Sequence, residues 1–253
     1  MKNVILQGKH ISKVFIRSGI KNKVLDRIDV DVYDKDFTII MGSSGAGKST
    51  LLYALSGMDT ITEGKVLYKG KVISGLKEND MAKLRAEEFG FVFQQTHLVS
   101  NLTLFENVAV AGYVGKKEST ERVQERTGHL LRQMGAEKVK DQFPSQVSGG
   151  EAQRAAIARA FIKKPGLLFA DEPTGALNKS HSLEVLNLLT EINRSGQSIL
   201  MVTHDLRAAV RGNRILYLED GKIMDEMTLP FYRKTEERQR ENRISEWLSR
   251  MQW

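Results

Sequence analysis

The sequence has no cysteine and no long apolar stretch, and each absence excludes a class of protein. Without cysteine there is no disulfide scaffold and no thiolate metal site, which fits a reducing compartment. No apolar run approaches the roughly 20 residues that a helix needs to cross a bilayer. The first ten residues reach a polar and a charged side chain too early for a signal peptide. We therefore expect a cytosolic protein unless a partner holds it at a membrane.

Internal repeats and low-complexity linkers are also lacking, and the rest of the composition is that of a globular protein. The 253 residues suffice for one large or two modest domains. Hydrophobic residues make up 41% and charged residues 27%, which is ordinary. The net charge of +7 would suit nucleic acid, anionic lipid or nucleotide as a partner. Because the positive residues are spread along the chain, a solvated basic surface is the simpler interpretation.

Residues 42–50 form a glycine-rich loop that matches the phosphate-binding pattern G-x-x-x-x-G-K-[ST]. The apolar run 38–41 before it predicts a buried strand, and the leucines in 48–57 predict a helix that stops at Gly57. Strand, loop and helix is the context that this motif requires. Small residues let backbone N–H groups approach a triphosphate, at which the positive end of the helix is aimed. The candidate binding residues are Gly42, Ser43, Ser44, Gly45, Ala46, Gly47, Lys48, Ser49 and Thr50.

Three side chains of this loop have separate expected roles. The Lys48 ammonium is expected to neutralise the β- and γ-phosphates of ATP. The Ser49 hydroxyl is a candidate ligand for Mg²⁺, and Thr50 is expected close to the α-phosphate. An ordinary glycine-rich turn is the alternative, and the motifs further along the chain argue against it.

Two adjacent acids, Asp171 and Glu172, end the apolar run LLFA. A carboxylate at the end of a buried strand is costly unless it binds a metal ion or its water shell, so Asp171 is a candidate Mg²⁺ ligand. Glu172 can orient or deprotonate a water as a general base. A plain strand end is the alternative for this pair taken alone.

Strands that alternate with helices predict a doubly wound α/β core. The segment 183–194 predicts a helix between two apolar strands, and the segment 103–136 is helical and charged, which indicates a separate helical subdomain. The runs that predict strands after the first helix are 66–68, 90–93, 167–170 and 198–203.

The tail, residues 235–253, has apolar side chains at i, i+3, i+4 and i+7, which predicts an amphipathic helix. Its apolar face either packs on the domain's own surface or binds a partner or a membrane. The apolar positions are Ile244, Trp247, Leu248 and Met251.

Residues 147–160 read VSGGEAQRAAIARA, and they complete a known set of motifs. The segment resembles the signature L-S-G-G-Q of the nucleotide-binding subunits of ABC transporters, with Val147 for leucine and Glu151 for glutamine. The resemblance covers nearly the whole chain. It implies that the signature caps a helix and contacts the γ-phosphate of ATP held by a second subunit, where a hydroxyl, glycine N–H groups and a helix dipole form an anion site. The signature residues are Ser148, Gly149, Gly150 and Glu151.

The resemblance implies roles for three more residues. Gln94 matches the glutamine that senses Mg²⁺ and couples to the membrane subunit. His204 matches the histidine that contacts the γ-phosphate, so the implied catalytic set is Glu172, His204 and Lys48. Phe15 matches the aromatic residue that stacks on adenine, a role that needs only a π face. A structural histidine at a strand end and a core phenylalanine are the alternatives.

The fold that the resemblance implies is an α/β, P-loop (RecA-like) ABC nucleotide-binding domain with an antiparallel β subdomain and an inserted α-helical subdomain. We expect the ABC domain at residues 1–230, with its core at 1–95 and 164–230 and the helical subdomain at about 96–163. Residues 231–253 form the C-terminal amphipathic tail.

The sequence departs from the family pattern in the loop TGALN, which ends in Asn178 where the family usually has aspartate. Asparagine keeps the size and one acceptor but loses the charge. This leaves the details of communication between subunits open, whereas ATP binding is not affected. Because Glu172 is retained, we expect hydrolysis to be retained too.

DEPTGALN at 171–178 and the stretch 89–108 resemble the branch that serves macrolide exporters, lipoprotein release and bacitracin-type peptide resistance. GALN favours the antimicrobial-peptide resistance group of Gram-positive bacteria. The implied function is an ATP-hydrolysing, energy-coupling subunit of a bacterial ABC transporter, peripheral on the cytoplasmic face of the membrane, with ATP and Mg²⁺ as cofactors. The expected partners are a multi-span permease and a second copy of the chain across two ATP sites, and nucleic acid is not expected.

The segment 94–105 is the expected contact with the permease, because it carries many apolar side chains and few charges. Exposed apolar surface of this size normally binds a partner. Alternatively, these side chains fill the core of the helical subdomain. They are Leu98, Val99, Leu102, Leu104 and Phe105.

Two other classes of ATPase share the nucleotide motifs. A soluble ABC-type ATPase that acts on a cytosolic scaffold, as in iron–sulfur cluster assembly, differs in the segments around Gln94 and Asn178. A chromosome-maintenance or repair ATPase inserts a long coiled coil between the motif halves, and the segment between Gln94 and Ser148 is too short to hold one.

Overall fold

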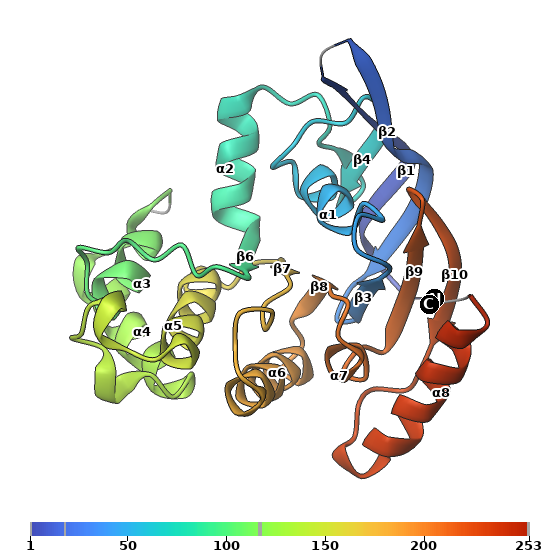
Figure 1. The fold of residues 1–253 in the computed structure, drawn as a ribbon. Helices are drawn as coiled ribbons and strands as arrows, with labels where there is room; N and C mark the ends of the chain where they lie inside the picture. Colours follow the sequence, from blue (N-terminus) through green and yellow to red (C-terminus); the bar gives the residue numbers. More distant parts are fainter. Residues whose placement is uncertain (1, 18, 116–117, 252–253) are drawn as a thin grey trace. The chain divides into compact units, whose positions relative to one another are not determined.

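The computed structural model describes three stretches of the chain, residues 2–17, 19–115 and 118–251. Their contacts divide the chain into two compact units. The first unit combines both ends of the chain, Met1–Met81 and Gly196–Trp253, and the second unit is Ala82–Ser195. Figure 1 shows strands from the two ends, in blue and in red, side by side in the first unit.

The first unit contains an antiparallel sheet with the strand order β2-β1-β4-β5. Its two long strands form a hairpin in which Phe15 lies opposite Asn22. Residues alternate between the faces, as the polar–apolar alternation of the first forty residues indicates. The strands are β1 (Val4–Arg17), β2 (Ile20–Tyr33), β4 (Glu63–Tyr68) and β5 (Lys71–Val72).

A second group of strands in the first unit has the order β10-β9-β3-β8. β3 pairs in parallel with both β8 and β9, whereas β10 pairs antiparallel with β9. Every residue of β3 and β8 is buried, which explains their continuous apolar sequences. The strands are β3 (Phe37–Met41), β8 (Ser198–Val202), β9 (Arg214–Glu219) and β10 (Lys222–Thr228).

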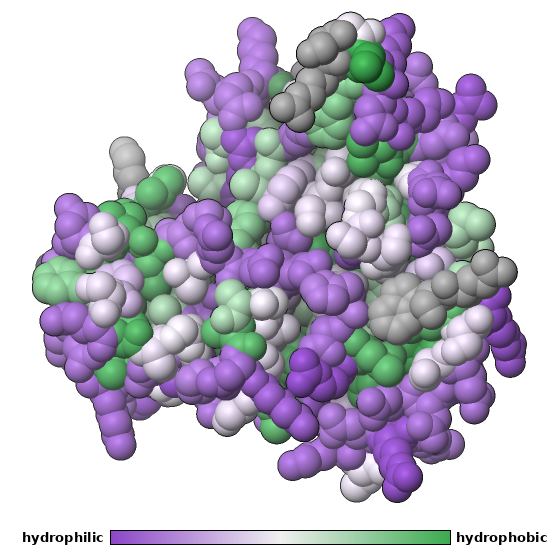
Figure 2. All heavy atoms as spheres, in the orientation of Figure 1, coloured by the Kyte–Doolittle hydropathy of each residue, from purple (hydrophilic) through white to green (hydrophobic). Residues whose placement is uncertain are grey.

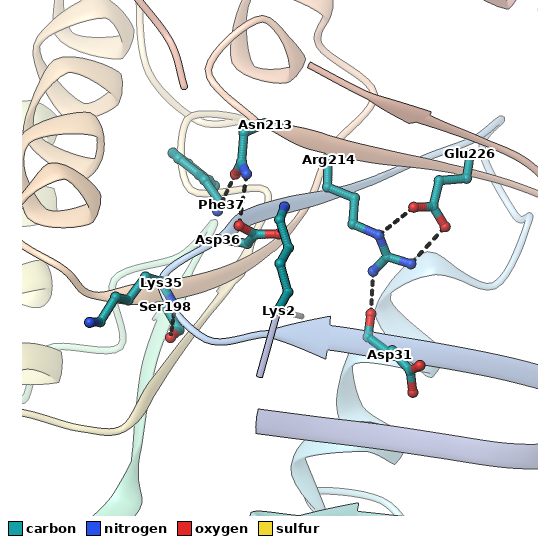
Figure 3. Close-up of polar contacts among 9 residues, drawn as sticks. All are labelled: Lys2, Asp31, Lys35, Asp36, Phe37, Ser198, Asn213, Arg214 and Glu226. Carbon is teal, nitrogen blue, oxygen red and sulfur yellow. Dashed lines mark hydrogen bonds and ion pairs between the residues drawn. The ribbon is translucent and has the colours of Figure 1, made fainter. Parts of the chain in front are cut away.

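Buried polar side chains fix this group of strands in register (Figure 3). The Asn213 amide accepts a hydrogen bond from the Phe37 backbone N–H at 2.6 Å and donates one to Asp36 at 2.8 Å. The Arg214 guanidinium binds both carboxylate oxygens of Glu226 on β10 and also donates to the backbone carbonyl of Asp31 on β2. Charged and buried, Arg214 therefore joins the two groups of strands.

The described part of the first unit contains the helices α1 (Lys48–Ser56), α7 (Leu206–Ala209) and α8 (Glu237–Ser249). α8 runs beside β10 (Figure 1), and its buried side chains Ile244, Trp247 and Leu248 are those of the predicted amphipathic face. The Arg240 guanidinium donates to the carbonyl oxygens of Val210 and Gly212, just after α7. Of the tail predicted at 231–253, the last two residues lie outside the described part of the chain.

The second unit combines two parallel strands with a set of helices. β6 (Phe89–Phe93) pairs with β7 (Leu167–Asp171), and Phe93 lies opposite Asp171. Stacked and edge-on aromatic rings line these strands, as between Phe91 and Phe169 at 5.4 Å. The helices are α3 (Leu104–Tyr113), α4 (Thr120–Gln133), α5 (Gly149–Phe161) and α6 (Lys179–Arg194), and α2 (Glu78–Glu88) runs across the boundary between the units. The short 3₁₀ turns η1 (Glu137–Val139) and η2 (Pro144–Gln146) also lie in this unit, whereas η3 (Lys234–Glu236) precedes α8 in the first unit.

Apolar side chains of α3, α4 and α5 form the core of the helical region, and Leu104, Val123 and Ile157 are fully buried there. Leu104 is therefore a core residue, whereas Val99 in the loop before α3 is 50% exposed. Within the apolar segment 94–105, Leu104 thus fills the core, whereas the side chain of Val99 is left exposed.

The fold is the predicted α/β class, with parallel strands, an antiparallel sheet and a helical region. Within the described stretches, no helix combines the length and the apolar character that crossing a bilayer requires. The face drawn in Figure 2 is mostly hydrophilic, with hydrophobic residues in small scattered groups.

Candidate functional site

The glycine-rich loop connects β3 to α1 and is closely packed at both ends. A Cβ placed on Gly42 would lie 2.0 Å from the backbone carbonyl oxygen of Leu218. Gly47 is the N-cap of α1 with φ +100°, and a Cβ there would lie 3.0 Å from the carbonyl oxygen of Val24. Only glycine fits both positions. Because Gly47 has no side chain, the cap residue of α1 places no acceptor of its own at this helix N-terminus, where backbone N–H groups favour an anion.

The Lys48 ammonium is buried against the loop that it is expected to serve. It donates to the carbonyl oxygens of Gly42 at 2.9 Å and Ser43 at 2.8 Å. The Ser43 hydroxyl in turn donates to the Glu219 carboxylate at the end of β9, at 2.8 Å. Ser43 is therefore held on two sides. A buried ammonium beside a glycine-capped helix N-terminus forms a cradle that suits the charge of a phosphate group.

His204 lies at the same edge of the parallel strands as the glycine-rich loop. It follows β8, and the backbone N–H of Thr203 donates to the carbonyl oxygen of Ile40 on β3 at 3.1 Å. The Asp205 N–H donates to the Thr203 hydroxyl at 2.9 Å, and Asp205 caps α7. The imidazole itself is exposed. His204 thus lies beside β3, the strand that leads into the glycine-rich loop. Hydrogen bonds of Thr203 and Asp205 hold the backbone on either side of it.

Phe15 lies on β1 with 43% of its surface exposed, so it is not a core residue. The ammonium of Lys13 lies 4.9 Å from the centroid of its ring, within the range of a cation–π contact. An exposed aromatic ring in the first unit is what stacking on a nucleobase would require.

In the second unit, Gln94 follows β6, and Asp171 is the last residue of the neighbouring strand β7. β6 and β7 are parallel, so the two residues reach the same edge of the pair. The Gln94 side chain packs against Gly175, where an added Cβ would lie 2.8 Å from Gln94 Nε2. Gln94 and the turn after Glu172 are therefore in contact, at the edge of the strand pair where Asp171 ends β7.

Glu172 has a left-handed backbone with φ +45°. Its carbonyl oxygen accepts a hydrogen bond from the Gly175 N–H at 2.9 Å, which closes a tight turn. A non-glycine residue in this conformation carries strain of roughly 1–2 kcal/mol. Strain of this kind gathers at active sites, where it sets the direction of a side chain.

The signature residues Ser148 and Glu151 form a capping box at the start of α5. The Ser148 hydroxyl and backbone N–H donate to the Glu151 carboxylate at 2.7 and 2.8 Å, and the Glu151 N–H donates back to the hydroxyl. These hydrogen bonds, above all that from the Ser148 side chain, hold the pKa of Glu151 below its usual value. Glu151 is thus engaged with the helix cap, a role that the pattern S-x-x-E signals in the sequence.

The loop that ends at Asn178 packs directly on the signature. A Cβ added to Gly150 would lie 2.7 Å from the His181 ring, so only glycine admits this contact. The Asn178 amide oxygen caps α6 by accepting from the His181 N–H at 2.9 Å. Below this point the Arg154 guanidinium binds the Glu184 carboxylate at 2.6 Å. Asparagine therefore fills the helix-capping role that an aspartate would have.

Sequence reasoning missed two polar residues at the loop, Tyr217 and Glu219. They lie two positions apart on β9 and therefore on the same face. Desolvation raises the pKa of Tyr217 to about 12, and the hydrogen bond from Ser43 lowers that of Glu219. The available signal was a carboxylate at the end of an apolar strand, the same signal that identified Asp171.

Comparisons with known proteins agree with this geometry. The family model described as ABC transporter matches residues 25–175. The chain is 40% identical over 223 residues to the macrolide export ATP-binding/permease protein MacB of Wolinella succinogenes. That alignment covers 88% of this chain and 34% of the relative, so the chain spans about a third of its length.

Solved structures show the same fold. The dimeric ATP-binding cassette MJ0796, in a post-hydrolysis state bound to ADP and Pi, is 33% identical with a TM-score of 0.84. The match covers 90% of this chain and all of that one. CbiO1 of Clostridium perfringens, part of the ABC transporter complex cbiONQ, is 26% identical with a TM-score of 0.79, over 90% of this chain and 89% of that chain.

The fold and the glycine-rich loop define a P-loop ATPase. The family model extends across the loop, the signature and the acidic strand end. The chain belongs to the ABC transporter family.

Proposed function

We propose that this ATPase is the energy-coupling subunit of a bacterial ABC transporter, peripheral on the cytoplasmic face of the membrane. The loop that carries Gly42, Gly47 and the buried Lys48 is the observation that carries this proposal, because it is shaped for a triphosphate. The family membership of the chain supplies the link to transport.

In this proposal each site residue keeps the role expected from the sequence. Lys48 neutralises charge on the β- and γ-phosphates, and the loop N–H groups bind them. Ser49, Gln94 and Asp171 supply oxygen donors, which is the donor chemistry that Mg²⁺ prefers. When bound, Mg²⁺ neutralises charge on the phosphate oxygens. Phe15 offers its ring to adenine.

Hydrolysis depends on two further side chains. Glu172 orients the attacking water and accepts its proton, for which the fixed backbone of the turn aims the carboxylate. His204 donates a hydrogen bond to the γ-phosphate. Glu172 and His204 raise the rate because they act on charge that develops in the transition state. Lys48 also binds charge that is already present in the ground state.

Two variants test these roles. Lys48→Ala should weaken MgATP binding, measured by calorimetry. Glu172→Gln should bind MgATP as the wild type does, yet lose turnover by about 10²–10⁴, the usual effect of losing a general base. Turnover of Glu172→Gln within threefold of the wild type would refute the assignment.

A second copy of the chain is proposed to complete each ATP site. Ser148 and Gly149 are exposed at the N-terminus of α5, where a phosphate of the partner's nucleotide would be favoured by the helix dipole. Gly150 is covered by His181 and gives this end of the helix a fixed shape. The related cassette MJ0796 is itself dimeric with ADP and Pi bound.

The loop before α3 is the proposed contact with a multi-span permease. Val99 is 50% exposed, although its backbone is held by the Asn107 side chain through both N–H and carbonyl groups. An apolar side chain on a rigid, exposed loop suits a partner helix that covers it. Leu104, which lies in the core, is not part of this contact.

Val99→Asp tests the contact because it adds charge without removing a core side chain. The variant should keep its own ATPase rate and lose the permease on co-purification from detergent-solubilised membranes. Leu183→Asp is the matched control, since Leu183 is equally exposed on α6 of the same unit. If Val99→Asp assembles normally, or if both variants lose the permease equally, the surface around Val99 is not the contact with the permease.

The transported molecule is proposed to be an antimicrobial peptide, on the basis of the GALN segment 175–178. The similarity to a macrolide export protein makes macrolides the competing substrate class. The two substrate classes are distinguished in bacteria that express the permease together with either the wild-type gene or its Glu172→Gln variant. Protection by the wild type alone against bacitracin-type peptides supports the proposal, and protection against macrolides alone overturns it.

A further inference from the structure

The end of β9 brings a carboxylate to the start of the phosphate-binding loop. β9 pairs with β3, so Tyr217 lies opposite Met41, the residue before the loop. Tyr217 and Glu219 point to the same face of β9. This register sets Glu219 beside Ser43 at the start of the loop.

Glu219 contacts the loop through several groups. One carboxylate oxygen accepts from the Ser43 hydroxyl at 2.8 Å, and the other accepts from the Tyr217 hydroxyl at 2.9 Å. The Ser43 backbone N–H and the Lys48 charge also favour its ionised form. Since Lys48 holds the carbonyl oxygen of the same serine, the loop start is fixed by a carboxylate and an ammonium together.

The C-terminal helix α8 supports this arrangement from behind. The Trp247 ring lies edge-on to the Tyr217 ring, with 6.4 Å between centroids, and its indole N–H donates to Asp225 on β10 at 2.7 Å. Both aromatic rings are buried. The Tyr217 ring therefore has one position, from which its hydroxyl reaches Glu219.

We propose that Glu219 is a positioning residue of the phosphate-binding loop. Glu219 holds Ser43 and Lys48 ready for the triphosphate, and Tyr217, which lies beneath α8, holds Glu219 in place. The inference rests on the proposed ATP site. If the loop is fixed before the nucleotide arrives, a larger fraction of the free protein is competent to bind. The apparent Kd is the intrinsic Kd divided by that fraction. Removing the carboxylate should therefore weaken binding even though Glu219 does not touch the nucleotide.

The test compares MgATP and MgADP binding by calorimetry in four variants and one control. Glu219→Ala and Ser43→Ala should each raise the Kd about tenfold, which is the size expected for one hydrogen bond to a charged group. The double variant should be no worse than either single one, because both remove the same bond. Glu219→Gln keeps an acceptor oxygen and should hold the Kd at or below about three times the wild-type value. Glu241→Ala, an exposed carboxylate of α8, is the control and should bind normally.

A steady-state readout separates positioning from general destabilisation. The effect of Glu219→Ala should fall on KM rather than on kcat, and Tyr217→Phe should show a smaller shift in the same direction. A wild-type Kd in Glu219→Ala, additive effects in the double variant, or failure of Glu219→Gln to restore binding would overturn the inference. Should Glu219→Ala not fold, Ser43→Ala and Tyr217→Phe decide alone. If Glu219→Ala and Lys48→Ala both bind MgATP normally, the proposed ATP site itself is wrong. That result is distinct from one in which only the inference about Glu219 fails.

Discussion

The backbone of Glu172 adopts a conformation that glycine would take without strain. We expect Glu172→Gly to be more stable than Glu172→Ala by about 1 kcal/mol, because alanine keeps the left-handed strain and glycine does not. Urea unfolding of the two variants measures the difference. Both should lack turnover, so any gain in stability comes with loss of function.

The alanine variant is the matched control, since it removes the same carboxylate. Equal unfolding free energies would mean that the turn relaxes when the side chain is cut back. In that case the backbone at residue 172 would not hold the carboxylate in place.

The raised pKa of Tyr217 predicts how the stability of the protein changes at alkaline pH. Burial and the neighbouring Glu219 raise its pKa to about 12 from a usual value of 10. Because the folded value is the higher one, its contribution to stability is complete below pH 10 and is lost as the pH rises through about 12. Ultraviolet titration should show a tyrosinate component near pH 12 that is absent in Tyr217→Phe. An identical titration of both proteins would contradict the buried hydrogen bond.

For single residues, the sequence predicts those whose role depends on their position within a contiguous motif. Lys48 and Ser148 belong to contiguous motifs, and the structure places them at helix N-termini as the motifs require. Glu219 could not be found in this way. Its partner Ser43 is far away along the chain, and only the pairing of β9 with β3 brings the two together.

Among the elements, α6 shows how a cap defines a helix. The predicted start at residue 183 was wrong by four residues, because Asn178 caps the helix and α6 begins at Lys179. Asn178→Ala should lower the free energy of unfolding by about 0.5–2 kcal/mol, the usual effect of losing an N-cap. Asn178→Asp should keep the full stability, since aspartate also caps and its charge suits the helix N-terminus.

Thermal unfolding of the three proteins checks this expectation. If Asn178→Asp were as unstable as Asn178→Ala, the asparagine would be needed for something besides capping, such as its own N–H donors. Equal stability of all three would show that the cap contributes nothing.

Elements with strong periodicity were predicted well, and weakly patterned ones were not. β3 and β8 are continuous apolar runs, and α1 ends at Gly57 with the left-handed cap that its sequence indicates. The prediction overlooked α2, because Met81 is its one buried residue and its charged positions show no apolar stripe. Such a helix owes its position to tertiary contacts, which a single sequence does not reveal.

For the whole molecule, we predict an ATP-dependent dimer. Glu172→Gln should sediment as a monomer without nucleotide and as a dimer with MgATP, because the uncleaved nucleotide holds both surfaces together. Adding Ser148→Arg should abolish the dimer by blocking the signature. Ser195→Arg, at an exposed helix end of the same unit, should leave it intact. A monomer that binds ATP tightly would rule out the shared sites.

α5 is anchored near its C-terminal end as well as capped at its beginning. The Arg159 guanidinium donates to the carbonyl oxygens of Thr96 and His97, each at 2.6 Å, in the loop after Gln94. A helix of 13 residues is a stiff rod of roughly 20 Å. Over that length, a tilt of about 3° of the whole helix corresponds to about 1 Å of displacement at the signature. In the proposed shared site, a displacement of that size at Ser148 would decide whether its hydroxyl meets a phosphate oxygen, so the contact of Arg159 with the loop after Gln94 would bear on the nucleotide of the partner copy.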